Sequence, residues 1–244
     1  MNDNKLLLYL HIPKTAGSSF TQAITDNCPN TVHFYKLSNV FQLQAELGNA
    51  DALCGHFQYG VHHYTDRPYQ YVTMLRLPVE RTLSYFYFKY KNPSYKPYYN
   101  KDLTFDDYVL DPAYDLEYCN LQARMIAGQI GKPFPSFKKA RDILNDQFAF
   151  VGFREQYDLS LFLFMQKMNW KPKHFSKVNV TPNRPADLKL SSEAAKIVLL
   201  KNEVDRQLYE HAYRKFNKKI REKILDLTYD QEKQLKAYLK EAKK

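Results

Sequence analysis

Short apolar runs alternate along the chain with segments in which apolar residues recur every three or four positions. The first run, Leu6–Ile12, has the continuous hydrophobicity of a strand that is buried on both faces. Between residues 20 and 24 the apolar positions change to helical spacing, and Ser18 or Ser19 is a suitable N-cap for that helix. The chain therefore opens with a predicted strand, a tight loop and a helix.

Later stretches of the chain repeat this order of strand, loop and helix. A second apolar run, 51–54, leads into a glycine-containing loop, and residues 69–76 form a β-branched and aromatic run that ends shortly before Pro78. Proline suits the first turn of a helix, so a helix is predicted from Pro78 onward. Residues 148–153 are predicted to be extended and residues 159–168 to be helical.

The remaining segments are predicted to be helices and one long loop. Residues 89–102 mix Tyr, Lys, Pro and Asn without periodicity, which is typical of an exposed loop. Thr104 can cap a short helix, and residues 115–128 are predicted to form another helix that Gly128 closes. Residues 192–216 are predicted to form one amphipathic helix.

Strands that alternate with helices predict an α/β fold, a P-loop-like three-layer arrangement with a central, mainly parallel sheet flanked by helices. We expect a single domain over residues 1–244, with residues 214–244 as a basic helical C-terminal extension. In parallel sheets, ligands bind at the carboxyl ends of the strands. The loops that follow Ile12, Cys54 and Leu75 are therefore expected to meet at one edge.

The loop after the first strand, residues 13–19, has the composition of an anion-binding turn. The start of a helix presents free N–H groups and the positive end of its dipole, while Lys14 adds a charge and Gly17 allows close approach. The spacing is not that of a nucleoside triphosphatase loop, because Lys14 and Thr15 precede the first glycine. No G-x-G-x-x-G motif occurs, and no acidic residue ends either later strand to hold magnesium. We predict an anion bound without a metal; a capped helix with an incidental surface lysine is the alternative.

A second anion site is predicted around Arg76, at the carboxyl end of its strand. Arg81 and Ser84 follow on the next helix, three residues apart and off its predicted apolar face. Arginine binds phosphate in a bidentate manner, and a serine hydroxyl can add a hydrogen bond. The alternative is that Arg76 and Arg81 form surface salt bridges, for example with Glu80. Two anion sites on one edge indicate a ligand with two phosphates.

Two segments in this order resemble the cofactor motifs of a known enzyme family. HIPKTAGSSF (11–20) followed by TMLRLPVERTLSYFYF (73–88) is similar to the signatures of sulfotransferases that use 3′-phosphoadenosine-5′-phosphosulfate (PAPS). The resemblance is to the carbohydrate group that includes the heparan sulfate 2-O- and 6-O-sulfotransferases, and to bacterial sulfotransferase family 2 proteins. CGHFQYG (54–60), FVGFREQYD (150–158) and NVTPNRP (179–185) fall where that family has further signatures.

The resemblance implies a PAPS-dependent sulfotransferase of EC 2.8.2 type that requires no metal. It implies that the 5′-phosphosulfate is held by six consecutive residues, Lys14, Thr15, Ala16, Gly17, Ser18 and Ser19. It also implies that Arg76 and Ser84 hold the 3′-phosphate, which remains on the product, adenosine 3′,5′-bisphosphate (PAP). Leu77 departs from the pattern, because the family commonly has Asp at this position.

Sulfuryl transfer to a hydroxyl needs a group that removes the hydroxyl proton, and histidine is the usual base near neutral pH. His56 lies at the end of the second apolar run and aligns with the base of the resembling enzymes. We predict His56 as general base and Lys14 as the charge that stabilises the leaving phosphate. The alternatives are a packed histidine without a chemical role and a metal site that joins His56 with His62, His63 and Asp66.

The acceptor is predicted to bind along a stretch in which aromatic and cationic residues alternate. The stretch contains Tyr85, Tyr87, Lys89, Tyr90, Lys91, Tyr95, Lys96, Tyr98 and Tyr99. Aromatic faces stack on sugar rings and lysines attract acidic groups, so the interpretation is a carbohydrate or glycan acceptor. The alternative is a helix end followed by an exposed loop without a ligand.

Net charge and cysteine content restrict partners and location. Six of the ten net positive charges fall within residues 214–244, but acidic residues are interspersed there, which is more typical of a solvated helix face than of a nucleic-acid-binding arm. Peripheral contact of this helix with a membrane stays open, as do two rival functions, a small-molecule kinase and a nucleic-acid-binding module. No apolar run approaches the ~20 residues of a transmembrane helix. The three cysteines are odd in number and widely spaced, so no disulfide framework and a cytoplasmic location are expected.

Overall fold

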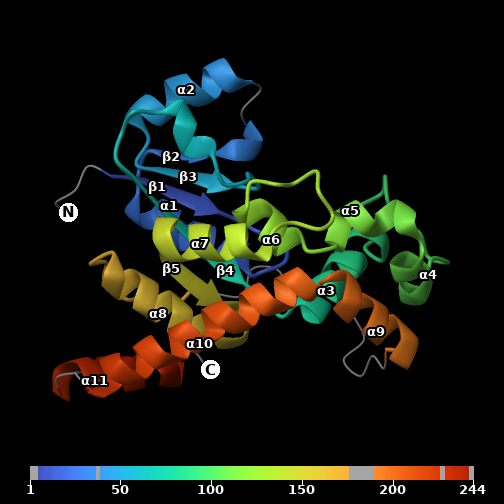
Figure 1. The fold of residues 1–244 in the computed structure, drawn as a ribbon. Coiled ribbons are helices and arrows are strands. Elements are labelled where there is room, and N and C mark those ends of the chain that lie inside the picture. Colours follow the sequence, from blue (N-terminus) through green and yellow to red (C-terminus); the bar gives the residue numbers. More distant parts are fainter. Residues whose placement is uncertain (1–4, 37–38, 176–189, 226–228, 242–244) are drawn as a thin grey trace.

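A five-stranded, fully parallel sheet forms the centre of the computed structural model, which describes residues 5–36, 39–175, 190–225 and 229–241 (Figure 1). The strand order is β2-β3-β1-β4-β5. The strands are β1 (Leu6–Leu10), β2 (Thr31–His33), β3 (Ala52–Gly55), β4 (Tyr69–Leu75) and β5 (Phe148–Phe153). The predicted α/β class is confirmed, and the sheet is entirely rather than mainly parallel.

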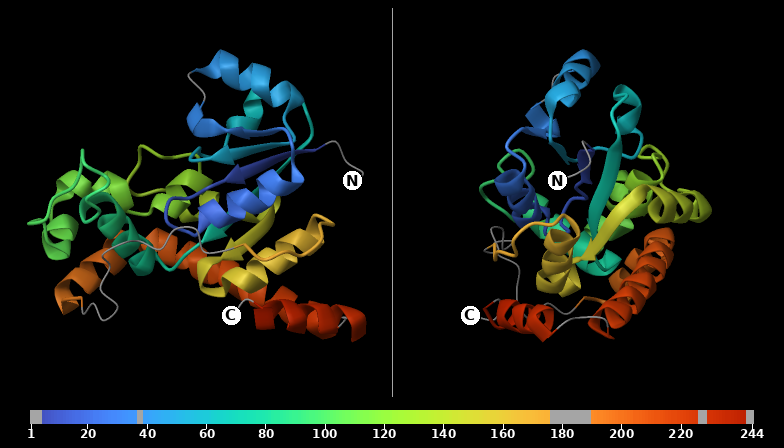
Figure 2. Two further views of the ribbon diagram at one scale, coloured as in Figure 1. Left: turned by 180° about the vertical axis from the view of Figure 1, so that it is seen from behind. Right: turned by 90° about the vertical axis from the view of Figure 1, so that its left-hand side faces the viewer.

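Both faces of the sheet are covered by helices, because alternate side chains of each strand point to opposite faces. Leu6, Leu8 and Leu10 of β1 pack into one apolar cluster, and Leu7 and Tyr9 pack into another. The first cluster takes in residues of α2 (Val40–Asn49), α6 (Leu121–Ile126), α7 (Phe137–Gln147) and α10 (Glu203–Leu225). The second takes in residues of α1 (Gly17–Asn27) and α8 (Tyr157–Lys167). The result is the predicted three-layer arrangement (Figure 2).

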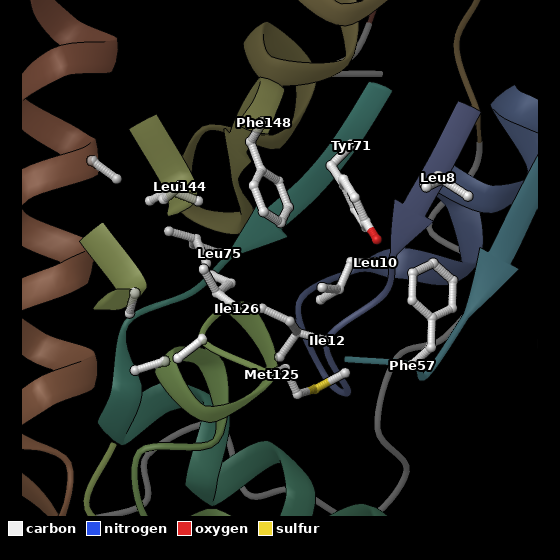
Figure 3. Close-up of a cluster of buried hydrophobic side chains, with 14 of the residues drawn as sticks. Leu8, Leu10, Ile12, Phe57, Tyr71, Leu75, Met125, Ile126, Leu144 and Phe148 are labelled. Atoms are coloured by element: carbon white, nitrogen blue, oxygen red, sulfur yellow. The ribbon is translucent and has the colours of Figure 1, made fainter. Parts of the chain in front are cut away.

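Figure 3 shows the interior of the first cluster, where side chains from the sheet meet α6 and α7. Leu10 and Tyr71 come from β1 and β4, while Ile126 and Leu144 come from α6 and α7. Leu10 and Ile126 are fully buried. This packing fixes the positions of β1 and β4, and with them the starting points of the loops that follow these strands.

A third apolar cluster lies beyond the carboxyl ends of the strands and contains no strand residue. It joins α3 (Pro78–Tyr90), α4 (Phe105–Leu110), α5 (Asp115–Tyr118) and α9 (Ser192–Lys201), which lie to the right in Figure 1. Thr104 forms the predicted cap of α4, with a reciprocal capping box to Asp107. The remaining elements are four 3₁₀ turns and one helix: η1 (Phe34–Lys36), η2 (Val61–Tyr64), η3 (Pro112–Tyr114), η4 (Arg154–Gln156) and α11 (Tyr229–Glu241).

Two predicted helices are each broken in two, and the breaks contact one another. The helix predicted over 115–128 is interrupted at Asn120, whose φ is 48°, and the helix predicted over 192–216 is interrupted at Asn202. The Asn120 N–H donates to the Asn202 side-chain oxygen over 3.0 Å. Each break is therefore satisfied by the other, a tertiary arrangement that local spacing does not reveal. α10 continues without interruption through residue 214.

Within the part of the chain that the structure describes, no helix is both long and apolar enough to cross a membrane.

Candidate functional site

The loops after β1, β3 and β4 lie together at the carboxyl edge of the sheet. Leu10 pairs with Gly55 of β3 on one side and with Thr73 of β4 on the other. The predicted convergence of these three loops follows from the order of the parallel strands (Figure 1). Direct contacts join Arg76 to the Lys14 carbonyl and His56 to the His11 carbonyl at this edge.

The loop between β1 and α1 is shaped by two non-glycine residues in the left-handed region. Lys14 has φ 70° and Ala16 has φ 69°, while Thr15 between them does not share this conformation. Such alternation turns successive backbone N–H groups toward one concave side, a common anion-binding arrangement. Strained backbone of this kind is concentrated at functional sites.

The start of α1 differs from the prediction. Ala16 is the N-cap and makes no side-chain cap bond, so neither Ser18 nor Ser19 caps the helix. The helix starts earlier because Gly17 can lie against the ring of His11: a Cβ at Gly17 would come within 1.8 Å of the His11 Nε2. The fully buried Thr15 donates its hydroxyl to the carbonyl of Ile12 over 2.8 Å. Ser18 is exposed and Ser19 is buried.

Arg76 joins the end of β4 to this loop by direct contact. Its Nη1 donates to the backbone carbonyl of Lys14 over 3.1 Å, and its Nη2 pairs with Glu80 over 3.3 Å. The alternative salt bridge predicted for Arg76 therefore exists, but the same guanidinium also touches the loop. Only 12% of the Arg76 side chain is exposed, so its charge is held at the edge rather than free in solvent.

The backbone of Arg76 is clamped by Gln122 of α6. The Gln122 side chain accepts from the Arg76 N–H over 3.0 Å and donates to the Arg76 carbonyl over 2.9 Å. Asp205 of α10 in turn accepts from the backbone N–H groups of Gln122 and Ala123. Gln122 and Asp205 were not found from the sequence, because both lie far along the chain from the motif that they support.

Lys14 lies in an environment that disfavours its charge. Partial burial and the neighbouring Arg76 lower the pKa of Lys14 to about 8. Its Nζ is 4.1 Å from the centre of the Phe88 ring, a cation–π contact with α3. Glu80 is the anionic partner of Arg76. An additional anion such as a phosphate, bound between Lys14 and Arg76, would relieve the repulsion between the two cations.

His56 and His11 form a pair at the ends of β3 and β1. Their ring centres are 4.5 Å apart, and His56 Nδ1 lies 2.6 Å from the His11 carbonyl oxygen. A carbonyl only accepts, so Nδ1 donates to it, and in the neutral tautomer of the exposed His56 ring Nε2 is the acceptor. Burial, His56 and Lys14 lower the pKa of His11 to about 3, which keeps its ring neutral. His11 has no role in the sequence interpretation, although it is the first residue of the motif HIPKTAGSSF.

The two remaining predicted residues of the second anion site lie in different environments. Ser84 is one helical turn before Phe88, so it shares the α3 face that meets Lys14, and 3% of it is exposed. Arg81 is fully buried, donates to the Tyr118 carbonyl over 2.9 Å, and has Asp205 as the carboxylate that favours its charge. Arg81 is therefore not on the edge, and neither the predicted anion contact nor the alternative surface salt bridge describes it.

Leu77, the departure from the family pattern, is the N-cap residue of α3. It makes no side-chain cap bond, and 42% of it is exposed. Its backbone N–H donates to Glu155 over 2.9 Å, and the other Glu155 oxygen accepts from Tyr209 over 3.0 Å. The Glu155 carboxylate thus reaches the start of α3. Glu155 lies in the segment 150–158, for which the sequence indicates a similarity to a family signature but no role.

The alternative metal site does not form in the described residues. They contain no group of three or more His, Cys, Asp or Glu side chains that could hold a metal ion. His62 is buried and its Nδ1 lies 2.9 Å from the hydroxyl of Tyr71, whereas His63 is exposed. The motif at 179–185 lies outside the described residues.

The acceptor stretch divides into a buried and an exposed part. Tyr87 and Tyr90 are buried in the helical cluster, and Lys89 is paired with Glu117. Tyr95, Tyr98 and Tyr99 are exposed large aromatics of the loop that follows α3. Lys91 donates to backbone carbonyls at Asn100 and Lys101, so it holds the loop closed.

Comparisons with known proteins identify the family. None of the curated proteins matches the chain. The match to a family model confirms the resemblance found in the sequence at the level of the family. The model described as the Sulfotransferase family matches residues 1–230, so the chain belongs to the sulfotransferase family.

Proposed function

We propose that this sulfotransferase takes its sulfuryl group from PAPS and transfers it to a hydroxyl of a carbohydrate or glycan acceptor. The observation that carries the proposal is the contact between Arg76 and the Lys14 carbonyl. It joins the two predicted anion sites at one edge, although they lie on different strands. A donor with phosphate groups at both ends of its ribose requires two such sites within reach of one another.

The loop after β1 has the features that a phosphosulfate needs. Its left-handed residues and the uncapped start of α1 leave backbone N–H groups free of a side-chain cap bond, and Lys14 adds a cation. We assign the 5′-phosphosulfate to the loop Lys14–Ser19, with Ser18 as the exposed hydroxyl. The 3′-phosphate is assigned to Arg76 and Ser84, and requires Arg76 to share or exchange its Glu80 partner.

His56 is the proposed general base. When bound, PAPS supplies an activated sulfuryl group on a phosphate leaving group. The acceptor hydroxyl loses its proton to His56 Nε2, since Nδ1 is committed to the His11 carbonyl. That hydrogen bond also stabilises the imidazolium that forms, because the carbonyl accepts more strongly from a charged donor. His11 is a poor base because its lowered pKa leaves it little affinity for a proton.

Lys14 is proposed to stabilise negative charge on the leaving phosphate. The phosphate gains charge as the sulfuryl group departs, and a partly desolvated cation stabilises it more than a solvated one would. Burial and Arg76 lower the pKa of Lys14, so negative charge that develops on a nearby phosphate favours the ammonium form.

The acceptor is proposed to approach along a row of aromatic rings that begins at Lys14. The Lys14 ammonium lies over the Phe88 ring. The ring centres of Phe88 and Tyr95 are 5.2 Å apart, and those of Tyr95 and Tyr98 are also 5.2 Å apart. Lys89 lies 4.5 Å from the Tyr98 ring. Exposed tyrosines stack on sugar rings, and the row leads from solvent to the proposed reaction centre.

Calorimetry with PAP tests the donor assignment. Lys14→Ala and Arg76→Ala should each weaken PAP binding by roughly tenfold or more, as loss of a charge-assisted phosphate contact does. Lys138→Ala is the matched control, because this lysine is 81% exposed on α7. Unchanged PAP affinity in both site variants would refute the assignment, and phosphoryl transfer from magnesium ATP would favour the kinase alternative.

Activity measurements separate the base and the acceptor surface. His56→Ala should retain PAP binding but lose roughly 10²-fold or more in kcat. Tyr95→Ala with Tyr98→Ala should raise the acceptor KM with little change in PAP affinity, whereas Phe41→Ala, which removes an exposed ring from α2, should not. A double variant with unchanged acceptor KM contradicts the acceptor assignment alone.

A further inference from the structure

A groove runs beside β5, away from the edge that holds Lys14 and Arg76. It has a cavity volume of about 330 Å³, which is within the range of small-ligand sites. Its apolar wall is formed mainly by Leu144, Phe148, Phe150, Val151, Leu163 and Phe216. These residues come from β5 and from helices on both faces of the sheet.

The groove follows the free edge of the sheet. β5 is the last strand in the order, so one side of it has no neighbouring strand among the described residues. Four consecutive residues, 148–151, line the cavity, although successive side chains of a strand point to opposite faces. The cavity therefore wraps around the strand edge between α8 on one face and α7 and α10 on the other. Phe148 pairs with Tyr71 near the start of β4, whereas Phe153 pairs with Leu75, next to Arg76.

The charged residues of the groove all have one sign. Lys167, Lys215 and Lys219 line it, and no acidic residue does. Within the described ranges none of the three lysines forms an ion pair, and Lys215 donates only to the side-chain oxygen of Asn145. The nearby His211 has its pKa lowered by burial and by three cations, Lys215, Arg141 and Arg214, which indicates a positive local potential.

From this geometry we propose that the β5 groove is a binding site for a single-chain amphiphilic anion of the fatty-acid class. The apolar wall takes the alkyl chain, and the lysines at α8 and α10 take the carboxylate. An uncharged apolar ligand would leave three cations beside it without partners, and a small inorganic anion would leave the apolar wall exposed. A molecule that combines both properties matches the whole lining. The site does not depend on the proposed donor or acceptor, because it shares no residue with them.

Calorimetry with decanoate tests the proposal on the full chain. Decanoate is expected to bind with a stoichiometry of one, and the shorter pentanoate and the uncharged decanol are each expected to bind more weakly. Lys215→Gln with Lys219→Gln should weaken decanoate binding by roughly tenfold, as expected for lost charge-assisted contacts. The matched control, Lys138→Gln with Lys233→Gln, removes two exposed charges outside the groove and should leave the affinity unchanged.

Several results would overturn the proposal. They are no decanoate binding by the wild-type protein, equal affinity for decanol, or equal losses in the two double variants. Displacement of decanoate by PAP would place the anion at the Lys14 loop instead. Thermal unfolding of each variant is measured alongside, so that a loss of binding is read only from folded protein; the lysines are not in the buried core, and the variants should remain folded.

Discussion

Arg76 and Arg81 lie five positions apart at the start of α3, yet they serve opposite regions of the molecule. Arg76 lies on the carboxyl edge, where its guanidinium is divided between a loop carbonyl and a partly exposed carboxylate. Arg81 is fully buried at the junction of α3 with the segment around Tyr118 and with α10. Sequence motifs treat the two as equivalent cations, whereas burial separates a residue available to a ligand from one that holds helices together.

The two regions also differ in how completely their polar groups are satisfied. At the buried junction, Asp205 accepts from two backbone N–H groups, and Arg81 donates to the Tyr118 carbonyl while its Nε and Nη1 have no hydrogen-bond partner. Burial raises the pKa of Asp205, and Arg81 opposes that shift. At the carboxyl edge, in contrast, two cations, Lys14 and Arg76, lie close enough for Arg76 to lower the pKa of Lys14. The junction is therefore expected to respond in stability and the edge in ligand affinity.

The largest expected effect is on stability at the junction. Arg81→Met should lower the free energy of unfolding by about 3 kcal/mol, because it removes the buried hydrogen bond to the Tyr118 carbonyl and the nearby cation that favours the charge of buried Asp205. Arg76→Met should cost less than about 1 kcal/mol, since the carboxylate that it leaves behind, Glu80, is 41% exposed and can be solvated. Urea unfolding of the two variants measures both values. Equal losses would remove the distinction between the regions.

A smaller effect, on PAP affinity, is expected from pH at the edge. With a pKa of about 8, Lys14 is cationic below that pH and becomes neutral above it. The phosphates of PAP are ionised throughout this range, so PAP affinity should fall by up to about tenfold per pH unit above pH 8. Lys14→Arg keeps its charge and should bind PAP equally at pH 7 and pH 9. Calorimetry at each pH measures the PAP affinity of both proteins. An equal loss of PAP affinity in the wild type and in Lys14→Arg would assign the pH dependence to another group.

The smallest expected effect concerns the partner of Arg76. Glu80→Gln removes the carboxylate that competes with a phosphate for the guanidinium, so PAP should bind about two- to fivefold more tightly. Glu155→Gln is not equivalent, because this carboxylate holds the Leu77 N–H rather than Arg76. Weaker PAP binding by Glu80→Gln would show that the ion pair orients Arg76 instead of occupying it.

The sequence was sufficient where a general rule of parallel sheets applies. The apolar runs at 6–12, 51–54, 69–76 and 148–153 correspond to strands, with ends that differ by up to two residues. The rule that such strands share one carboxyl edge then brought Lys14, His56 and Arg76 together. β2, α2 and α7 were missed, because β2 is three residues long and the two helices bury only two residues each.

The sequence was insufficient where contacts join distant parts of the chain. Asp205 is the carboxylate that favours the charge of buried Arg81, and Gln122 clamps the backbone of Arg76. Local spacing marks neither residue. The groove at β5 is assembled from four elements and has no sequence motif at all. The tautomer of His56 likewise depends on a carbonyl of another strand end.

The ring of His11 lies where a side chain at Gly17 would be, and its carbonyl holds His56. Enlarging Gly17 would thus push on the imidazole and, through it, on the proposed base, without touching any ligand. The proposed donor loop and the proposed base are therefore packed against the same residue, His11. A change in the proposed donor preference would require residues 11, 17 and 56 to be redesigned together, since a substitution at one of them alters the space left for the others.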